Sequence, residues 1–201
     1  MILLTAMWGL GYAALAVSLA ILSYQILLER HHRSSQVAAQ ALLVVSTILL
    51  WTGLVLRMVR GHGWPFFSPA DLATGLSLLM LALYVGWSLI TGQRRAAPFT
   101  SAIAFALLSY VWRQQPPTLS TAPYPSAGVR WGTTLNLAGG AFLALAAATS
   151  LSTLIGQLDP QKQDPALVTY DRASEAFVRG ALFCLAASLA IDTWWLQKVG
   201  L

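Results

Sequence analysis

The chain has 201 residues, a net charge of +5 and a hydrophobic content of 57%, yet only 9% of its residues are charged. Soluble domains carry about 25% charged residues, so this composition excludes a soluble globular domain and predicts an integral membrane protein. The single cysteine, Cys184, excludes an intrachain disulfide and cysteine-pair redox chemistry. The basic residues stand singly or in pairs beside apolar runs, which favours lipid headgroups over nucleic acid as their partners.

Six apolar runs predict an all-α fold, an integral membrane bundle of six transmembrane helices that forms a single domain over residues 1–201. The runs are continuous and rich in Leu and Ala, without the alternation of a membrane β-barrel, and about 20 residues suffice to cross a hydrocarbon core of about 30 Å. The expected spans are approximately 2–28, 37–58, 71–91, 97–113, 132–158 and 172–196. The fourth is the shortest: its apolar part of about 16 residues covers only about 24 Å as a helix, which is less than the thickness of the hydrocarbon core.

Three polar connections are expected between these spans, at 29–35, 114–129 and 159–171. The second contains four prolines and is predicted to be a surface loop of partly extended polyproline character. Arg57 and Arg60 close the second span, and their long side chains are expected to extend to the lipid headgroups.

The start of the third span carries a local helix signal. Ser68 is expected to be the N-cap, Pro69 the first helical residue and Asp71 the third, which is a variant of the capping box. The span is expected to run to Thr91, with Gly92 closing it as a C-terminal glycine.

Small residues predict close helix packing at two places. Gly9 and Gly11 lie in the first span, and Gly139 and Gly140 lie in a fifth span that is rich in alanine. Small residues allow helix backbones to approach one another in a membrane, so we expect the fifth helix to be central in the bundle.

Polar residues within the spans are the next candidates for function. Arg179 and Asp192 are separated by about 220° around the sixth helix, so they cannot pair with each other, whereas Glu175 lies one turn before Arg179 and can pair with it. The role of Asp192 is left open between function and a place near the interface. Cys184 and Asn136 are expected to serve packing and interhelical hydrogen bonding.

Orientation follows from the basic clusters. Six spans place both termini on one side, and the two sides carry six and five basic residues, which does not decide between them. The clusters Arg30–Arg33 and Arg94–Arg95 favour a cytoplasmic position for their loops and an outer position for both termini in a bacterial inner membrane. His31 and His32, within the first cluster, are expected to belong to a basic interfacial loop.

His62 is the main candidate for cofactor chemistry. A neutral imidazole at the membrane surface can ligate haem iron or the metal of a chlorin, and Trp64, Phe66 and Phe67 lie beside it in the sequence. The alternative is a solvated loop histidine. No histidine lies within a predicted span, so this chain alone cannot supply a transmembrane bis-histidine haem site.

The order of Arg57, Gly61-His62, Pro65 and Asp71 resembles the cytochrome c assembly family, the CcsA-type membrane proteins that handle haem in system II cytochrome c maturation. In that family an arginine at the end of a span is followed by Gly-His, a proline and, six positions later, an acidic residue that starts the next helix. The resemblance implies haem handling in cytochrome c assembly with a partner chain. It implies that His62 contacts haem as a metal ligand.

Other features of the resemblance are less specific. The segment 185–196 with its tryptophan pair is similar to the helix that leads into the family's haem segment, but the W-G-x-x-W-x-W-D pattern of that segment does not occur in these 201 residues. Asp71 stands where the family usually has glutamate, and Gly63-Trp64 separates His62 from Pro65. Trp64, Phe66 and Phe67 would pack against the porphyrin.

Two other functions remain as alternatives. The sequence shows no nucleophile with an adjacent base, no carboxylate pair on one helix face and no phosphate-binding loop, so an enzyme is not expected. A non-catalytic accessory subunit of a respiratory or photosynthetic electron transport complex fits the aromatic loops and the small-residue helices. A small-solute transporter is disfavoured because the spans lack a polar pathway.

Overall fold

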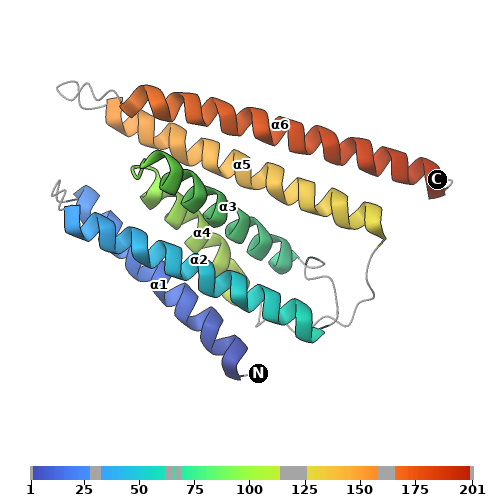
Figure 1. Ribbon diagram of the computed structural model, residues 1–201, viewed down its shortest axis with the longest axis horizontal. Coiled ribbons are helices and arrows are strands. Elements are labelled where there is room, and N and C mark those ends of the chain that lie inside the picture. Colours follow the sequence, from blue (N-terminus) through green and yellow to red (C-terminus); the bar gives the residue numbers. More distant parts are fainter. Residues whose placement is uncertain are drawn as a thin grey trace. The chain divides into compact units, whose positions relative to one another are not determined.

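The computed structural model describes residues 2–27, 33–61, 66, 69–113, 126–157 and 166–199. Within these ranges the chain is helical, without strands (Figure 1). The helices are α1 (Ile2–Leu27), α2 (Arg33–Gly61), α3 (Pro69–Thr91), α4 (Ala97–Arg113), α5 (Ala127–Gln157) and α6 (Ala166–Val199). Five are long and apolar enough to cross a membrane, and α4 is a shorter apolar helix. The all-α fold class is confirmed, and the helices fit a multi-pass membrane protein.

Three helices begin earlier than the hydrophobic runs do. Arg33, Ala127 and Ala166 are the first residues of α2, α5 and α6, so the predicted polar connections are wrong at the ends that lead into these helices. Hydropathy shows where a chain leaves the hydrocarbon, whereas a helix continues until its terminal backbone groups are satisfied. In α5 the first helical hydrogen bond runs from the Arg130 N–H to the Ser126 carbonyl, 3.1 Å away.

The chain divides into two compact units, Met1–Ala122 and Pro123–Leu201. Unit 1 contains α1 to α4 and unit 2 contains α5 and α6. Each unit is described by itself. The single domain expected over the whole chain stays a prediction.

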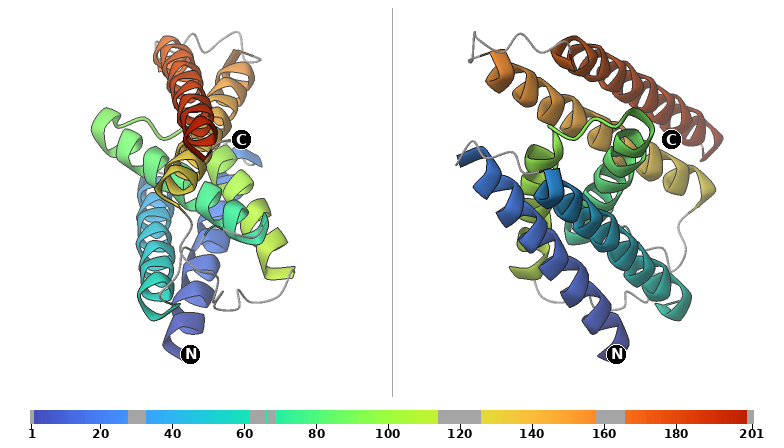
Figure 2. Two further views of the ribbon diagram at one scale, coloured as in Figure 1. Left: turned by 90° about the vertical axis from the view of Figure 1, so that its right-hand side faces the viewer. Right: turned by 60° about the vertical axis from the view of Figure 1, so that its left-hand side comes forward.

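In unit 1, α1 packs along α2, α3 packs along α4, and the two pairs meet through α1 with α4 and α2 with α3 (Figure 2). The approach of α1 to α2 requires glycine at two positions. A Cβ at Gly11 would lie 2.8 Å from the Leu50 side chain, and one at Gly53 would lie 2.7 Å from the Trp8 indole nitrogen. Close packing at Gly11 is therefore confirmed, whereas Gly9 has no neighbour within 4 Å and is not a packing point.

The ends of α3 agree with the capping signals. The helix begins at Pro69 and ends at Thr91. Gly92 has a positive φ of 70°, which costs glycine little, and its N–H donates to the Ser88 carbonyl at 2.9 Å. The expected N-cap, Ser68, lies outside the described residues.

Unit 2 is a helix pair whose close contact depends on glycines of α5. A Cβ at Gly128 would lie 2.6 Å from the Trp195 ring, one at Gly139 would lie 3.0 Å from Leu185, and one at Gly132 would collide with Asp192. Small-residue packing of the fifth helix is thus confirmed for its contact with α6, and its central place in the bundle stays a prediction. Cys184 is buried, as expected for a packing residue.

Candidate functional site

Polar contacts join α2 to α3 along what we call the α2–α3 seam. The bonds are Gln40 Nε2 to Ser88 Oγ (3.0 Å), Trp51 Nε1 to the Leu78 carbonyl (3.2 Å) and Arg57 Nη1 to Asp71 Oδ1 (2.6 Å). Steps along α2 are matched by nearly equal steps in the opposite direction along α3, as antiparallel helices require. These bonds therefore define the register of the two helices.

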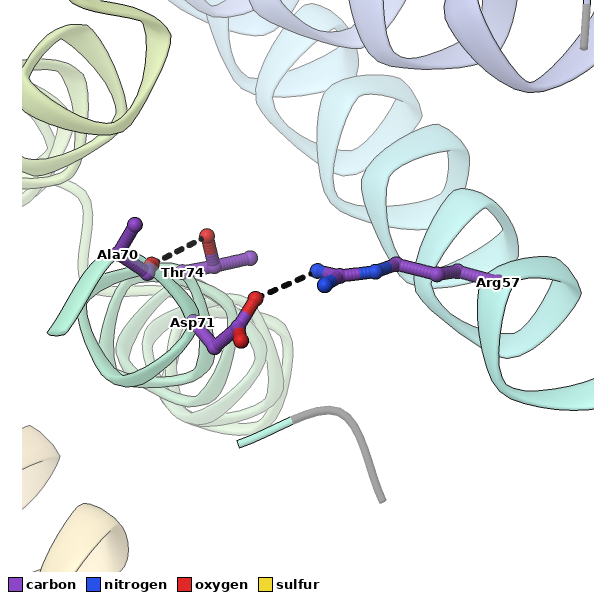
Figure 3. Close-up of polar contacts among 4 residues, drawn as sticks. All are labelled: Arg57, Ala70, Asp71 and Thr74. Carbon is purple, nitrogen blue, oxygen red and sulfur yellow. Dashed lines mark hydrogen bonds and ion pairs between the residues drawn. The ribbon is translucent and has the colours of Figure 1, made fainter. Parts of the chain in front are cut away.

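The ion pair between Arg57 and Asp71 is the most unusual of these contacts. Both residues are only 5% exposed, and Figure 3 shows the arginine reaching from the last turns of α2 to the carboxylate in the first turn of α3. Beside the pair, the Thr74 hydroxyl donates to the Ala70 carbonyl at 2.9 Å. A carboxylate near a helix N-terminus is also favoured by the helix dipole. The pair thus combines a buried charge contact with a favourable helix start.

The position of Arg57 corrects one prediction. Its side chain does not extend to the lipid headgroups but is buried against α3. A carboxylate within reach across the seam offers a better partner for a guanidinium than a distant headgroup does, because the contact is both charged and shielded from solvent. The side chain of Arg60 lies outside the described residues.

The sequence indicated that Arg57 and Asp71 belong to one motif but not that they touch. Asp71 was explained by capping, which is a local effect. The order of the helices could have predicted the contact. A short connection between antiparallel helices brings its two ends to the same end of the helix pair, so opposite charges at those ends come close together.

The structure describes little of the predicted haem-contact group. His62, Trp64 and Phe67 lie outside the described residues, and Phe66 is described as half-buried. His31 and His32 also lie outside them. The structure brings together Arg57 and Asp71, which lie on either side of the segment 62–68 that carries these candidates.

The buried face of α3 is unexpectedly polar. Thr74, Ser77 and Ser88 are buried on it together with Asp71. The Ser77 hydroxyl donates to the Ala73 carbonyl at 2.8 Å, one turn earlier, as Thr74 does to Ala70. Hydroxyls bonded in this way are satisfied by their own helix and pack at helix contacts. This row of buried hydroxyl groups was not expected from the sequence.

In α6 the predicted pairing of charges is confirmed. Arg179 Nη2 lies 2.5 Å from Glu175 Oε1, and the side chains are 76% and 63% exposed. Arg179 does not pair with Asp192, in agreement with their angular separation. Residues one turn apart on a helix meet whatever the helix packs against, so the pair needs no functional explanation.

Asp192 has a packing role at the contact of α6 with α5. The Asp192 carboxylate lies against Gly132. The Ser188 hydroxyl donates to the Gly132 carbonyl at 3.1 Å and lies 3.5 Å from Asp192 Oδ2. Asn136 is exposed, and Ser188 instead makes the interhelical hydrogen bond at this place. The interhelical hydrogen bond expected of Asn136 stays a prediction.

Among the described residues, no group of three or more His, Cys, Asp or Glu side chains could hold a metal ion. The predicted ligand, His62, is not among them. Comparison with known proteins finds no family model, no curated protein and no solved structure that matches this chain.

Proposed function

We propose that this chain is a CcsA-like membrane protein that handles haem in cytochrome c assembly together with a partner chain. The supporting observation is the buried contact of Arg57 with Asp71. Arg57 is the first residue and Asp71 the last residue of the motif on which the resemblance rests. They belong to different helices, so their order in the sequence does not by itself require them to touch. An arrangement in which they touch is what a folded, functional motif would need.

In this proposal the segment 62–68 forms the haem contact at the outer face of a bacterial inner membrane, with both chain termini on that side. His62 would be the residue that holds the iron through its imidazole, because neutral imidazole is a common ligand of haem iron. Trp64, Phe66 and Phe67 would pack their rings against the porphyrin, since aromatic side chains combine a large apolar area with a preference for membrane interfaces. The iron would supply the ligand-exchange chemistry. The chain would hold the haem in place and shield it from solvent.

A partner chain is part of the proposal because unit 2 has a large apolar surface on α6. Leu182, Phe183 and Leu189 are more than 60% exposed. Lipid or a helix of another subunit would cover them. The same surface supports the alternative function, a non-catalytic accessory subunit of an electron transport complex.

An absorption spectrum tests the haem proposal. The full chain is purified in a mild detergent, its spectrum is recorded, and haemin is added stepwise to the wild type and to His62→Ala. We expect haemin to show a shifted Soret band on adding the wild type and no such shift with the variant, because the imidazole that would ligate the iron is removed.

The double variant His31→Ala/His32→Ala is the matched control, since it removes imidazoles from a different connection and should bind haemin like the wild type. A wild type that does not respond to haemin contradicts the haem proposal. If that protein instead co-purifies with a large membrane complex, the accessory-subunit function is favoured.

A further inference from the structure

Each of the four helices of unit 1 contributes one polar residue to a common level of the unit, which we call the polar layer. The residues are Ser18 from α1, Gln40 from α2, Ser88 from α3 and Ser101 from α4. The three serines are buried and Gln40 is half-buried. Side chains that converge from facing helices are how helix bundles build ligand sites in their cores.

Hydrogen bonds place the first three residues of the polar layer at one level. The Ser18 hydroxyl donates to the carbonyl of Ala39, the neighbour of Gln40, at 2.9 Å. Gln40 Nε2 in turn donates to Ser88 Oγ at 3.0 Å. The layer therefore runs without a break from α1 through α2 to α3.

Ser101 reaches the same level from α4. The Tyr12 ring stacks on Phe105 with the ring centroids 4.9 Å apart, and the Tyr12 hydroxyl lies 2.7 Å from Ser109 Oγ. Ser18 is six residues after Tyr12, or about 9 Å along α1, and Ser101 precedes Phe105 and Ser109 by about 6 and 12 Å along α4. Successive helices of unit 1 run in opposite directions, so α1 and α4 do as well (Figure 1). The two steps therefore end at the same level.

Two buried atoms of the polar layer, Gln40 Oε1 and Ser101 Oγ, have no hydrogen-bond partner among the described residues. The hydroxyl next to Ser101 behaves differently, because Thr100 donates to the Ala96 carbonyl of its own helix at 2.9 Å. Buried polar atoms in folded proteins are nearly always bonded to another protein group or to an ordered water molecule. The two unpartnered atoms thus indicate a ligand rather than a packing role.

We propose that the polar layer binds one water molecule, which donates a hydrogen bond to Gln40 Oε1 and shares a second one with the Ser101 hydroxyl. An amide oxygen only accepts, so its ligand must donate, whereas a hydroxyl does either. The residues of the layer are uncharged, which suits a small neutral molecule better than an ion. Two polar partners are enough for a buried water. Ser88 lies four residues, or about 6 Å, before Gly92 at the α3–α4 turn, so water has a short way in.

The experiment is nuclear magnetic resonance of the full chain in mild detergent with isotope-labelled glutamine. Gln40→Leu identifies the signal of the Gln40 side-chain amide, because that signal is missing from its spectrum. We expect a cross-peak between water protons and this amide in the wild type, since the amide nitrogen and Oε1 share one carbon. A rotating-frame spectrum separates this cross-peak from chemical exchange with the solvent.

Ser101→Ala removes one of the two partners of the water, so the cross-peak should be lost. Thr100→Val is the matched control, because it removes a neighbouring buried hydroxyl that is bonded within its own helix, and it should keep the cross-peak. Circular dichroism of each variant shows whether it is folded. A wild type without the cross-peak, or a folded Ser101→Ala that keeps it, overturns the water site.

Unfolding by SDS gives a second readout. Ser101→Ala should lower the unfolding midpoint less in the Gln40→Leu background than in the wild type, because both side chains bond the same water. Equal shifts in the two backgrounds overturn the proposal. Unequal shifts without a water cross-peak show that the two side chains bond each other directly, which overturns it as well. Haemin takes no part in these measurements, so their outcome is independent of the haem proposal.

Discussion

The α2–α3 seam and the contact of α5 with α6 show two different ways of joining membrane helices. Side-chain hydrogen bonds and a buried ion pair join α2 to α3. Glycines bring α5 close to α6, because Gly128, Gly132 and Gly139 let the facing side chains approach the α5 backbone. Neutral hydroxyl groups also bond across this contact, as Ser188 does to the Gly132 carbonyl. In a membrane, where lipid is as apolar as the helices, both close packing and hydrogen bonding can drive association.

The two contacts should therefore tolerate different changes. The seam depends on complementary charges, so it is sensitive to loss of one partner and less sensitive to loss of both. The contact of α5 with α6 depends on space, so it is sensitive to added volume. The ion pair between Glu175 and Arg179 in unit 2 is exposed and lies within one helix.

Replacing one member of the buried pair should have the largest effect on stability. Arg57→Gln leaves the Asp71 carboxylate without its guanidinium, and we expect a loss of about 3–5 kcal/mol in the free energy of unfolding. The double variant Arg57→Gln/Asp71→Asn should lose less, because no charge is left buried without its counter-charge. Unfolding by SDS in mixed micelles measures both. If the double variant loses as much as the sum of the two single variants, Arg57→Gln and Asp71→Asn, charge pairing does not stabilise the seam.

Adding a methyl group at the contact of α5 with α6 should have an intermediate effect. In Gly128→Ala the new Cβ would lie 2.6 Å from the Trp195 ring, so the ring must move, and we expect a loss of about 1–3 kcal/mol. The control is Gly86→Ala in α3, where no atom lies within 4 Å and alanine should be neutral or stabilising by up to about 1 kcal/mol. The same SDS titration compares them. If Gly128→Ala is as stable as the control, the contact does not depend on glycine.

Neutralising the exposed pair should have the smallest effect. We expect Glu175→Gln to change the free energy of unfolding by less than about 0.5 kcal/mol, because the pair joins residues one turn apart on the same helix and no contact between helices depends on it. A change as large as that of Arg57→Gln would indicate that another chain covers the pair in the purified protein. Size-exclusion chromatography with light scattering would then identify the complex.

Features of the fold and the candidate site that depend on neighbouring residues were predicted from the sequence, and those that depend on another helix were not. The start of α3 at Pro69 and its end before Gly92 were predicted, because capping depends on neighbouring residues. The beginnings of α2, α5 and α6 were placed too late, because hydropathy does not report the helical turns outside the hydrocarbon. The burial of Arg57 was missed because it depends on a residue from another helix.

The sequence by itself determined the helical membrane fold, because apolar runs of about 20 residues have no other stable form in a bilayer. It also determined the pairing of Glu175 with Arg179, since residues one turn apart on a helix meet regardless of tertiary structure. Only the tertiary structure decided that Arg57 contacts Asp71 and that Asp192 packs on Gly132. Those contacts depend on the register and the separation of two helices, which no local pattern of residues specifies.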